Sequence, residues 1–220
     1  MKSNIQAQEK YIECFDRDRN YWNNFYKGKI CDVPSLFAKF VLNQTEKGKS
    51  LLDIGCGNGR DSIYFASNGL KVTGIDASNV AISSLLASSS EGDVSFICDD
   101  FVTTGIYKEK FDYCYSRFSL HAVNYAQQKK LLQNIYDCLE NRGKFFVEVR
   151  SVNDELYGKG DMVEKDAYVY NGHFRRFIRR EELDAAIQGL GFQILSSEEK
   201  KDFAPFGKEN PYVIRLIAMK

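Results

Sequence analysis

Short apolar runs alternate with amphipathic stretches through the middle of the chain, between residues 50 and 151. Five apolar runs have the length and the bounding turns of buried strands: 49–55, 70–76, 94–101, 110–116 and 144–151. Three intervening segments show helical spacing: 60–69, 80–88 and 127–140. Strands that alternate with helices form a parallel sheet covered on both faces, and each crossover is expected to be right-handed.

The pattern changes after the fifth strand. Residues 152–172 are polar and aromatic without a clear period, and we interpret them as a lid-like insertion. A helix is predicted from Glu181 to near Gly191, followed by strands over 192–199 and 212–219. No helix fits between these two strands, so we expect them to pair antiparallel. The predicted fold class is α/β: a Rossmann-like, seven-stranded, mostly parallel sheet with helices on both faces and an antiparallel C-terminal strand.

Residues 1–48 precede the first strand, and we predict that they form an N-terminal helical cap on a main domain over 49–220. Apolar spacing predicts a helix from Pro34 to about Gln44. The first 20 residues are polar, with a few apolar positions at helical spacing, and both a lid helix and a frayed end remain open. Aromatic residues at 21–26 and in the insertion either cover a site or pack as ordinary core.

Composition and charge narrow the function classes. The 220 residues carry 30 Lys and Arg against 30 Asp and Glu, a net charge of zero, so no nucleic-acid partner is expected. Six cysteines without a C-x-x-C pair and only two histidines predict no metal site. Neither a secretory signal nor a membrane-spanning run is recognisable, so we expect a cytoplasmic protein without a membrane partner.

A glycine turn follows the first strand and opens a helix. Gly55, Gly57 and Gly59 lie in this turn, and Asp76 ends the next strand 21 residues after Gly55. A carboxylate there can accept the ribose hydroxyls of a nucleoside. The spacing departs from the dinucleotide fingerprint, and Asp53 beside the turn would repel a pyrophosphate but attract an ammonium or a sulfonium. These residues favour S-adenosyl-L-methionine (SAM) as the cofactor.

The segments DIGCGNG, GIDAS, FICDDF and FDYCYSRFSLHAV resemble the first four motifs of the class I SAM-dependent methyltransferases, and the resemblance extends from about Ser50 to the C-terminus. It implies that the ribose lies at Asp76, the adenine at Asp100 and Phe101, and the methionine moiety near Ser116. The cofactor-binding residues implied by the motifs and by the glycine turn are Asp53, Gly55, Cys56, Gly57, Gly59, Asp76, Ala77, Asp100, Phe101 and Ser116.

The acceptor side is less defined. His121 follows the fourth strand and is either a general base or a ring that packs under the cofactor. Arg117 and Arg150 end neighbouring strands at the edge where ligands bind, and with His121 they are the candidate catalytic residues. Candidate acceptor-binding residues are Tyr170, His173, Arg175 and Arg176. Several guanidiniums at one mouth would suit an anionic acceptor.

The expected reaction is methyl transfer to an oxygen of a small polar acceptor. A looser similarity to methyltransferases of bacterial capsule and lipopolysaccharide gene clusters suggests a sugar, a sugar phosphate or a phosphate-derived acceptor. Two alternatives remain open: N-methylation of a small molecule or peptide, and a non-catalytic SAM-binding partner subunit. The sequence gives no oligomeric state.

Overall fold

A twisted seven-stranded sheet runs through the computed structural model, which describes residues 19–28, 31–88 and 92–220. Its strands are β1 (Ser50–Ile54), β2 (Lys71–Asp76), β3 (Val94–Cys98), β4 (Phe111–Arg117), β5 (Leu139–Arg150), β9 (Gln193–Lys200) and β10 (Val213–Met219). The order is β3-β2-β1-β4-β5-β10-β9, and only β10 runs antiparallel to its two neighbours. The predicted fold class and the antiparallel C-terminal pair are confirmed.

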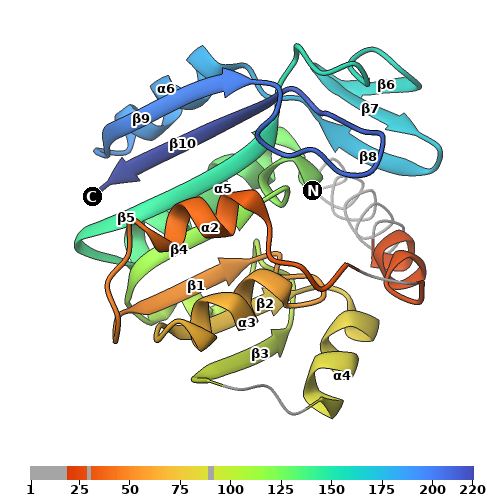
Figure 1. Ribbon diagram of the computed structural model, residues 1–220. Helices are drawn as coiled ribbons and strands as arrows, with labels where there is room; N and C mark the ends of the chain where they lie inside the picture. The colour runs from red at the N-terminus through yellow and green to blue at the C-terminus, as the bar shows by residue number, and fades with distance from the viewer. Residues whose placement is uncertain (1–18, 29–30, 89–91) are drawn as a thin grey trace, which may run out of the picture.

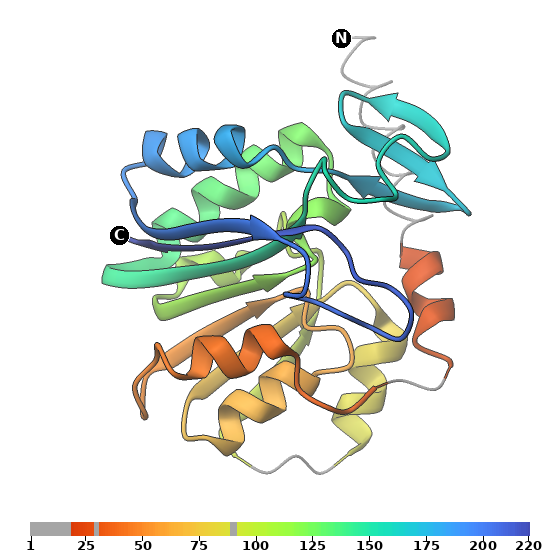
Figure 2. The ribbon, with the colours of Figure 1, turned by 45° about the horizontal axis from the view of Figure 1, so that its top comes forward.

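Helices cover both faces of this sheet (Figures 1 and 2). On one face lie α2 (Leu36–Leu42), α3 (Arg60–Ser67) and α4 (Asn79–Ala87), and on the other α5 (Tyr125–Cys138) and α6 (Arg180–Gly189). Leu131 and Ile135 of α5 and Leu183 of α6 pack in one buried cluster, and Phe37 of α2 and Phe65 of α3 pack in another. The sheet is buried on both faces, which explains its nearly continuous apolar strands.

The insertion after β5 forms a small antiparallel sheet. It contains β6 (Asp161–Glu164), β7 (Ala167–Tyr170) and β8 (His173–Arg176). Asn171 and Gly172 link β7 to β8 with φ angles of 52° and 72°, the left-handed pair that Asn-Gly favours in a two-residue hairpin. The sequence analysis treated 152–172 as irregular because strands of four residues are too short to reveal an alternation.

Two predicted boundaries shift around α5. Asn124 and Gln127 form a capping box, so the helix begins at Tyr125 rather than at 127. The chain enters β5 at Leu139, which pairs with Phe111 before a register shift. Gly143 therefore lies inside β5 and does not terminate the helix. Similarly, β3 ends at Cys98, which places Asp100 and Phe101 in the following loop.

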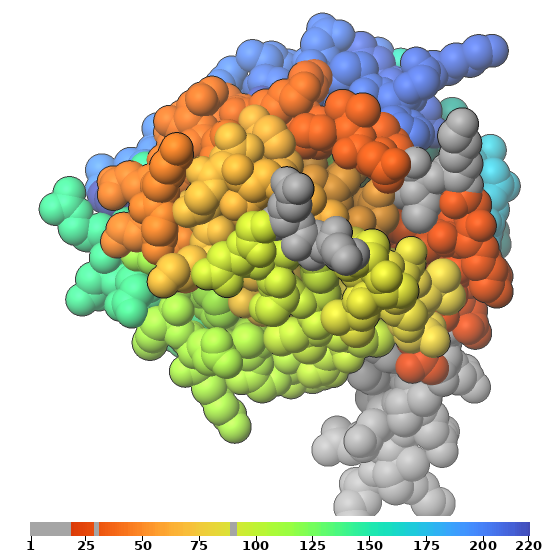
Figure 3. Space-filling view, turned by 60° about the horizontal axis from the view of Figure 1, so that its bottom comes forward, coloured from red at the N-terminus to blue at the C-terminus, as the bar shows by residue number. Residues whose placement is uncertain are grey.

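Residues 19–25 are helical and lie against the start of α4 (Figure 3). The contact is specific, because the Ser78 hydroxyl donates a hydrogen bond of 2.8 Å to Asn23 Oδ1. Further along, α2 packs in the sheet core rather than as a peripheral cap, and its N-cap Ser35 donates to the Asp61 carboxylate. The first 20 residues, for which a lid helix and a frayed end were both left open, lie outside the described residues as far as residue 18. None of the described helices has the length and apolarity needed to cross a membrane.

Candidate active site

One cavity of about 400 Å³ opens at the carboxyl edge of the sheet. It extends from the glycine loop after β1 to β8 and the loop 201–212, and residues 21–26 line one side. The sequence-predicted residues that line it are Asp53, Gly55, Cys56, Asp76, Ala77, Phe101, Arg117, His121, Arg150, His173 and Arg175. The fold therefore brings most of the predicted cofactor and acceptor residues to a single space. We call the part lined by Arg117, His121, Arg150, His173 and Arg175 the acceptor end.

The glycine loop needs glycine for two different reasons. Gly55 has a φ of 78°, and a Cβ there would lie 2.6 Å from the Ser119 Cβ. Gly59 has a φ of 73° and forms the N-cap of α3. A side chain on Gly57 would collide with the Tyr26 hydroxyl. The loop backbone is thus exposed to close approach by other groups, as a nucleoside site requires.

Asp76 ties this loop to the end of β2. Its Oδ2 accepts a hydrogen bond from the Gly57 N–H, and its Oδ1 accepts one from the Ser78 N–H, both at 2.8 Å. Each oxygen keeps a second lone pair for another donor. The carboxylate is therefore held in a fixed orientation in which it can still accept hydroxyl groups of a ligand.

Asp53 is the second carboxyl group of the cofactor region. It is 2% exposed, and its Oδ2 accepts a 2.6 Å hydrogen bond from the Ser62 hydroxyl. Burial, helped by the nearby carboxylates of Asp61 and Asp76 and opposed by the Ser62 hydrogen bond, raises its pKa to about 8. A cationic ligand would favour the ionised form, because opposite charges lower the pKa of an acid.

Residues 21–26 supply aromatic side chains that the sequence analysis left undecided between a cover and ordinary core. Tyr21, Trp22, Phe25 and Tyr26 all line the cavity. Burial raises the pKa of Tyr26, as do the charges of its neighbours, Asp76 first among them, so the phenol stays protonated. By contrast, Tyr157 and Tyr168 of the insertion pack against Phe177. Of these two aromatic groups, the one at residues 21–26 lines the cavity, and Tyr157 and Tyr168 of the insertion do not.

His121 lies in a short 3₁₀ turn, η2 (Leu120–Ala122), and is 4% exposed. Its Nδ1 accepts a 3.4 Å hydrogen bond from the Arg150 backbone N–H. Burial lowers the pKa of the ring well below its usual value, and the charge of Arg150 lowers it further. The ring is therefore neutral with its proton on Nε2, which makes it a hydrogen-bond donor toward any further partner.

Phe118 precedes this turn and was not anticipated. Its φ of 60° is left-handed, an uncommon conformation for a bulky residue. The Arg117 guanidinium carbon lies 4.5 Å from the ring centroid and that of Arg150 lies 5.7 Å away. Both guanidiniums thus lie within cation–π range of this ring at the acceptor end.

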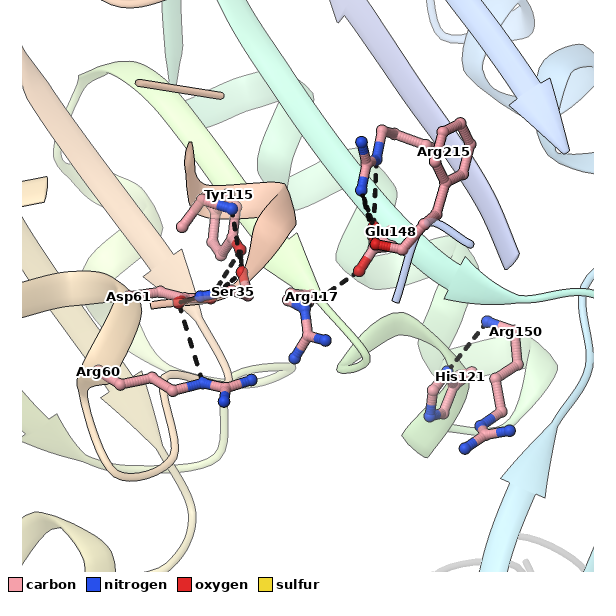
Figure 4. Close-up of polar contacts among 11 residues, drawn as sticks. Ser35, Arg60, Asp61, Tyr115, Arg117, His121, Glu148, Arg150 and Arg215 are labelled. Atoms are coloured by element: carbon pink, nitrogen blue, oxygen red, sulfur yellow. Dashed lines mark hydrogen bonds and ion pairs between the residues drawn. The ribbon is translucent and has the colours of Figure 1, made fainter. Parts of the chain in front are cut away.

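Glu148 of β5 is fully buried between two guanidiniums (Figure 4). It accepts a hydrogen bond of 3.1 Å from Arg117 Nε and one of 2.6 Å from Arg215 Nη2. Burial raises the pKa of Glu148, and both guanidiniums oppose the rise. The sequence held a signal for this group, because Glu148 is the one acidic residue in the apolar segment FFVEV.

Arg150 is also paired with acids. Its Nη1 donates to Asp154 at 3.0 Å, and its Nη2 donates to Glu209 at 2.9 Å. Glu209 comes from the loop before β10, which the sequence analysis did not connect with the site. Arg150 is therefore a neutralised group, contrary to the expectation that it offers its charge to an anion.

Two predicted acceptor-binding residues do not reach the cavity. Arg176 points toward α5, donating to Gln128 Oε1 at 2.8 Å and pairing with Glu164. Tyr170 lies on the exposed end of β7. Neighbours alternate faces along a strand, so Arg176 faces away from the cavity while His173 and Arg175 face it. We correct the prediction accordingly.

Four predicted cofactor residues act on the loops rather than line the cavity. Gly57 and Gly59 shape the glycine loop. Asp100 accepts hydrogen bonds from the Val102 N–H and the Thr103 hydroxyl, and so shapes the turn that carries Phe101. Ser116 is buried, with its hydroxyl 2.7 Å from that of Ser119. Contact of these four residues with the cofactor remains a prediction.

A sheet of this order, with a glycine loop after β1 and a carboxylate after β2, defines a nucleoside-binding α/β protein. Residues 22–197 match a family described as a methyltransferase domain, and the chain belongs to that family. It is a SAM-dependent methyltransferase, as the sequence motifs predicted. The residues fit this cofactor, because the two carboxyl groups, Asp53 and Asp76, suit cationic groups and hydroxyls rather than phosphates.

Relatives and solved structures agree with this assignment. A ubiquinone biosynthesis O-methyltransferase of Coxiella burnetii is 25% identical over 86% of this chain and 83% of its own length. A SAM-dependent methyltransferase structure from Methanosarcina mazei has a TM-score of 0.71 at 19% identity, covering 82% of this chain and 96% of that one. A Burkholderia thailandensis 1,6-didemethyltoxoflavin-N1-methyltransferase, with its acceptor and S-adenosylhomocysteine bound, has a TM-score of 0.67 at 20% identity, covering 100% and 89%.

Proposed function

We propose that this methyltransferase methylates an oxygen of a small polar acceptor bound at the acceptor end. One observation carries the proposal: a single cavity joins the glycine loop and Asp76 to His121 and Arg175. A methyl donor at one end and an acceptor at the other would meet within this cavity. The proposal keeps the predicted division into an N-terminal cap over 1–48 and a methyltransferase domain over 49–220.

Asp76 would accept the ribose hydroxyls of the cofactor, Asp53 would lie beside its cationic groups, and Phe101 would flank its base. The cofactor supplies an electrophilic methyl group on a sulfonium. The protein then has to exclude water and align the acceptor oxygen with the methyl group. These two effects supply most of the rate enhancement in such a transfer. Trp22 and Tyr26 are placed to exclude water, because they line the cavity on the side of residues 21–26.

His121 would orient the acceptor rather than deprotonate it. With Nδ1 engaged by the Arg150 N–H, the Nε2–H can donate to an acceptor oxygen. A donor of this kind suits an oxygen that already carries negative charge, and such an oxygen needs no base. His121 is therefore proposed as a hydrogen-bond donor in place of the general base that was the alternative from the sequence.

The name of the Coxiella relative supports oxygen as the methylated atom. The similarity to the N1-methyltransferase is below 25% identity and supports the fold alone. N-methylation and a non-catalytic SAM-binding subunit are the competing functions, and turnover separates all three.

The test is release of S-adenosylhomocysteine with a panel of small hydroxylated and amine acceptors, followed by mass spectrometry and NMR of the product. We expect an O-methyl product. An N-methyl product would favour the first alternative, and cofactor binding without turnover on any acceptor would favour the second. Asp76→Ala should abolish turnover and weaken SAM about 10- to 100-fold, whereas the exposed Asp93→Ala serves as a matched control.

A further inference from the structure

The guanidiniums around the acceptor end are not equivalent. Arg117 shares the buried Glu148 with Arg215, and Arg150 binds two acids of its own, Asp154 and Glu209. An arginine whose donors already engage carboxylates gains little from a further anion. These contacts remove Arg117 and Arg150 as the first choice for binding a charged acceptor.

Arg175 of β8 differs from them. It lines the cavity and is partly buried, yet across residues 19–28, 31–88 and 92–220 no acid forms an ion pair with it. Burial lowers its pKa and the positive charge of Arg150 lowers it further, while Tyr21, Glu209 and Asp154 oppose the shift from a distance. A guanidinium withdrawn from water without a directly paired carboxylate is costly, and a bound anion would offset that cost.

His173 lies two residues before Arg175 on the same face of β8 and also lines the cavity. The side chain is 3% exposed, and its Nδ1 has no hydrogen-bond partner among the described residues. Buried polar atoms are almost always partnered in folded proteins. This nitrogen is covered by protein, so the group beside it that a ligand in the cavity can reach is the Arg175 guanidinium.

The charges at the acceptor end leave room for a single negative charge. Among the described residues, the arginines that line this end and their ion-pair partners comprise four guanidiniums and three carboxylates, which leaves one positive charge. The arginines are Arg117, Arg150, Arg175 and Arg215, and the acids are Glu148, Asp154 and Glu209. A phosphate monoester, with close to two negative charges at neutral pH, would exceed this balance.

The walls beside Arg175 are aromatic. Tyr21 stacks on His173 at a centroid distance of 4.1 Å, and Trp22 meets the same ring edge-on at 5.1 Å. Phe118 and Phe206 line the same cavity. Flat apolar walls complement a flat apolar body, and they offer few partners for the several hydroxyls of a sugar.

We propose that the acceptor is a small aromatic monoacid whose carboxylate binds Arg175, with its ring against Trp22 and Phe118. One carboxylate oxygen would take the methyl group as the methyl–sulfonium bond breaks, which gives a methyl ester and S-adenosylhomocysteine and requires no base. This inference rests on the proposed function, because it assumes that the acceptor occupies this end. It makes Arg175, rather than Arg150, the residue that selects the acceptor, and it replaces the sugar-phosphate class suggested by the sequence.

Trp22 is the only tryptophan of the chain, so its fluorescence reports on this site alone. With S-adenosylhomocysteine bound, benzoate should change the fluorescence saturably. Benzamide, the neutral isostere, and glucose 6-phosphate should each bind about tenfold more weakly or worse. Equal binding of benzoate and benzamide would overturn the role of the charge, and preferred binding of glucose 6-phosphate would overturn the aromatic class.

Variants locate the carboxylate. Arg175→Gln should weaken benzoate about tenfold or more, and Arg175→Lys should fall between it and the wild type, because an ammonium lacks the planar fork. Arg142→Gln, exposed and outside the cavity, is the matched control. Unchanged benzoate affinity in Arg175→Gln contradicts the proposal. If Arg175→Gln does not fold, a wild-type affinity for benzoate in Arg175→Lys would contradict the proposal.

Binding of S-adenosylhomocysteine is measured separately by calorimetry in every variant. If the wild type does not bind S-adenosylhomocysteine, the proposed function is refuted. If it binds S-adenosylhomocysteine but does not respond to benzoate, only the acceptor class is refuted.

Discussion

At the scale of single residues, the buried carboxyl of Asp53 couples the cofactor site to pH. Its pKa of about 8 in the folded protein lies above the ordinary value of 3.8. The folded state therefore keeps a proton that the unfolded state loses above about pH 4. The contribution of Asp53 to stability falls as the pH rises between these two values and levels off above pH 8.

We expect SAM binding to release this proton, because the cationic cofactor favours the ionised carboxylate. Affinity should then rise with pH up to about 8, by at most about tenfold per unit. Calorimetry in buffers of different ionisation enthalpy measures the proton release. Asp53→Asn should bind more weakly and without this pH dependence. A wild-type affinity that is flat between pH 6 and 8 would contradict the coupling.

His121 is the second residue whose role can be separated by experiment. As a neutral Nε2–H donor it should contribute about tenfold to turnover, and His121→Gln, which keeps a donor, should retain more activity than His121→Phe. We expect His121 to contribute no ionisation to the pH profile of kcat/KM, so the wild type and both variants should show the same ionisations. Such an ionisation, together with a loss of 10²-fold or more in His121→Gln, would restore the general-base role.

Sequence reasoning found the residues of this site that belong to contiguous motifs, such as Gly55 and Asp76. It missed Glu209, and it assigned Arg150 to an anion, because ion pairs between residues 59 positions apart leave no local pattern. The left-handed Phe118 was equally hidden, since only tertiary packing imposes that conformation.

At the scale of elements, Glu148 joins three neighbouring strands. It lies on β5, and its carboxylate binds Arg117 of β4 and Arg215 of β10. Arg215 is packed among aromatic rings, with its guanidinium carbon 4.1 Å from the Phe203 ring centroid. Removing the shared carboxylate would leave two largely buried guanidiniums without a counter-charge.

Glu148→Gln should therefore lower the free energy of unfolding by about 3–5 kcal/mol, the range for breaking a buried ion pair from one side. Urea denaturation measures the change. Glu140→Gln, an exposed position on the same strand, should shift stability by less than about 0.5 kcal/mol. Comparable shifts in the two variants would mean that the network contributes little.

The segment 19–28 is the element that closes the cofactor side. Asn23 anchors it at α4, and the Tyr26 hydroxyl lies over Gly57. We expect Tyr26→Ala to speed S-adenosylhomocysteine dissociation about tenfold with little loss of stability. Stopped-flow displacement measures this rate, and the exposed Lys27→Ala is the control. Slower dissociation in Tyr26→Ala would show that the ring obstructs the cofactor instead of retaining it.

At the scale of the whole molecule, hydrophobic periodicity was enough to predict the layers and the seven strands. Strands such as β1 and β4 are mostly apolar and buried along most of their length because both faces are covered. The three-stranded sheet escaped prediction because β6 and β7 are four residues long and carry exposed side chains such as Met162. Its Asn171-Gly172 turn was the available signal.

The position of β10 also bears on how the chain is made. Of the described strands, the ribosome delivers this one last, yet it lies between β5 and β9 and pairs with both. Until β10 emerges from the ribosome, β9 has no strand to pair with. The edge of β5 that β10 will cover also keeps unpaired backbone groups, which can pair with other chains. We expect a nascent chain stalled before Val213 to depend on chaperones, and the completed sheet to form only after synthesis has passed that point.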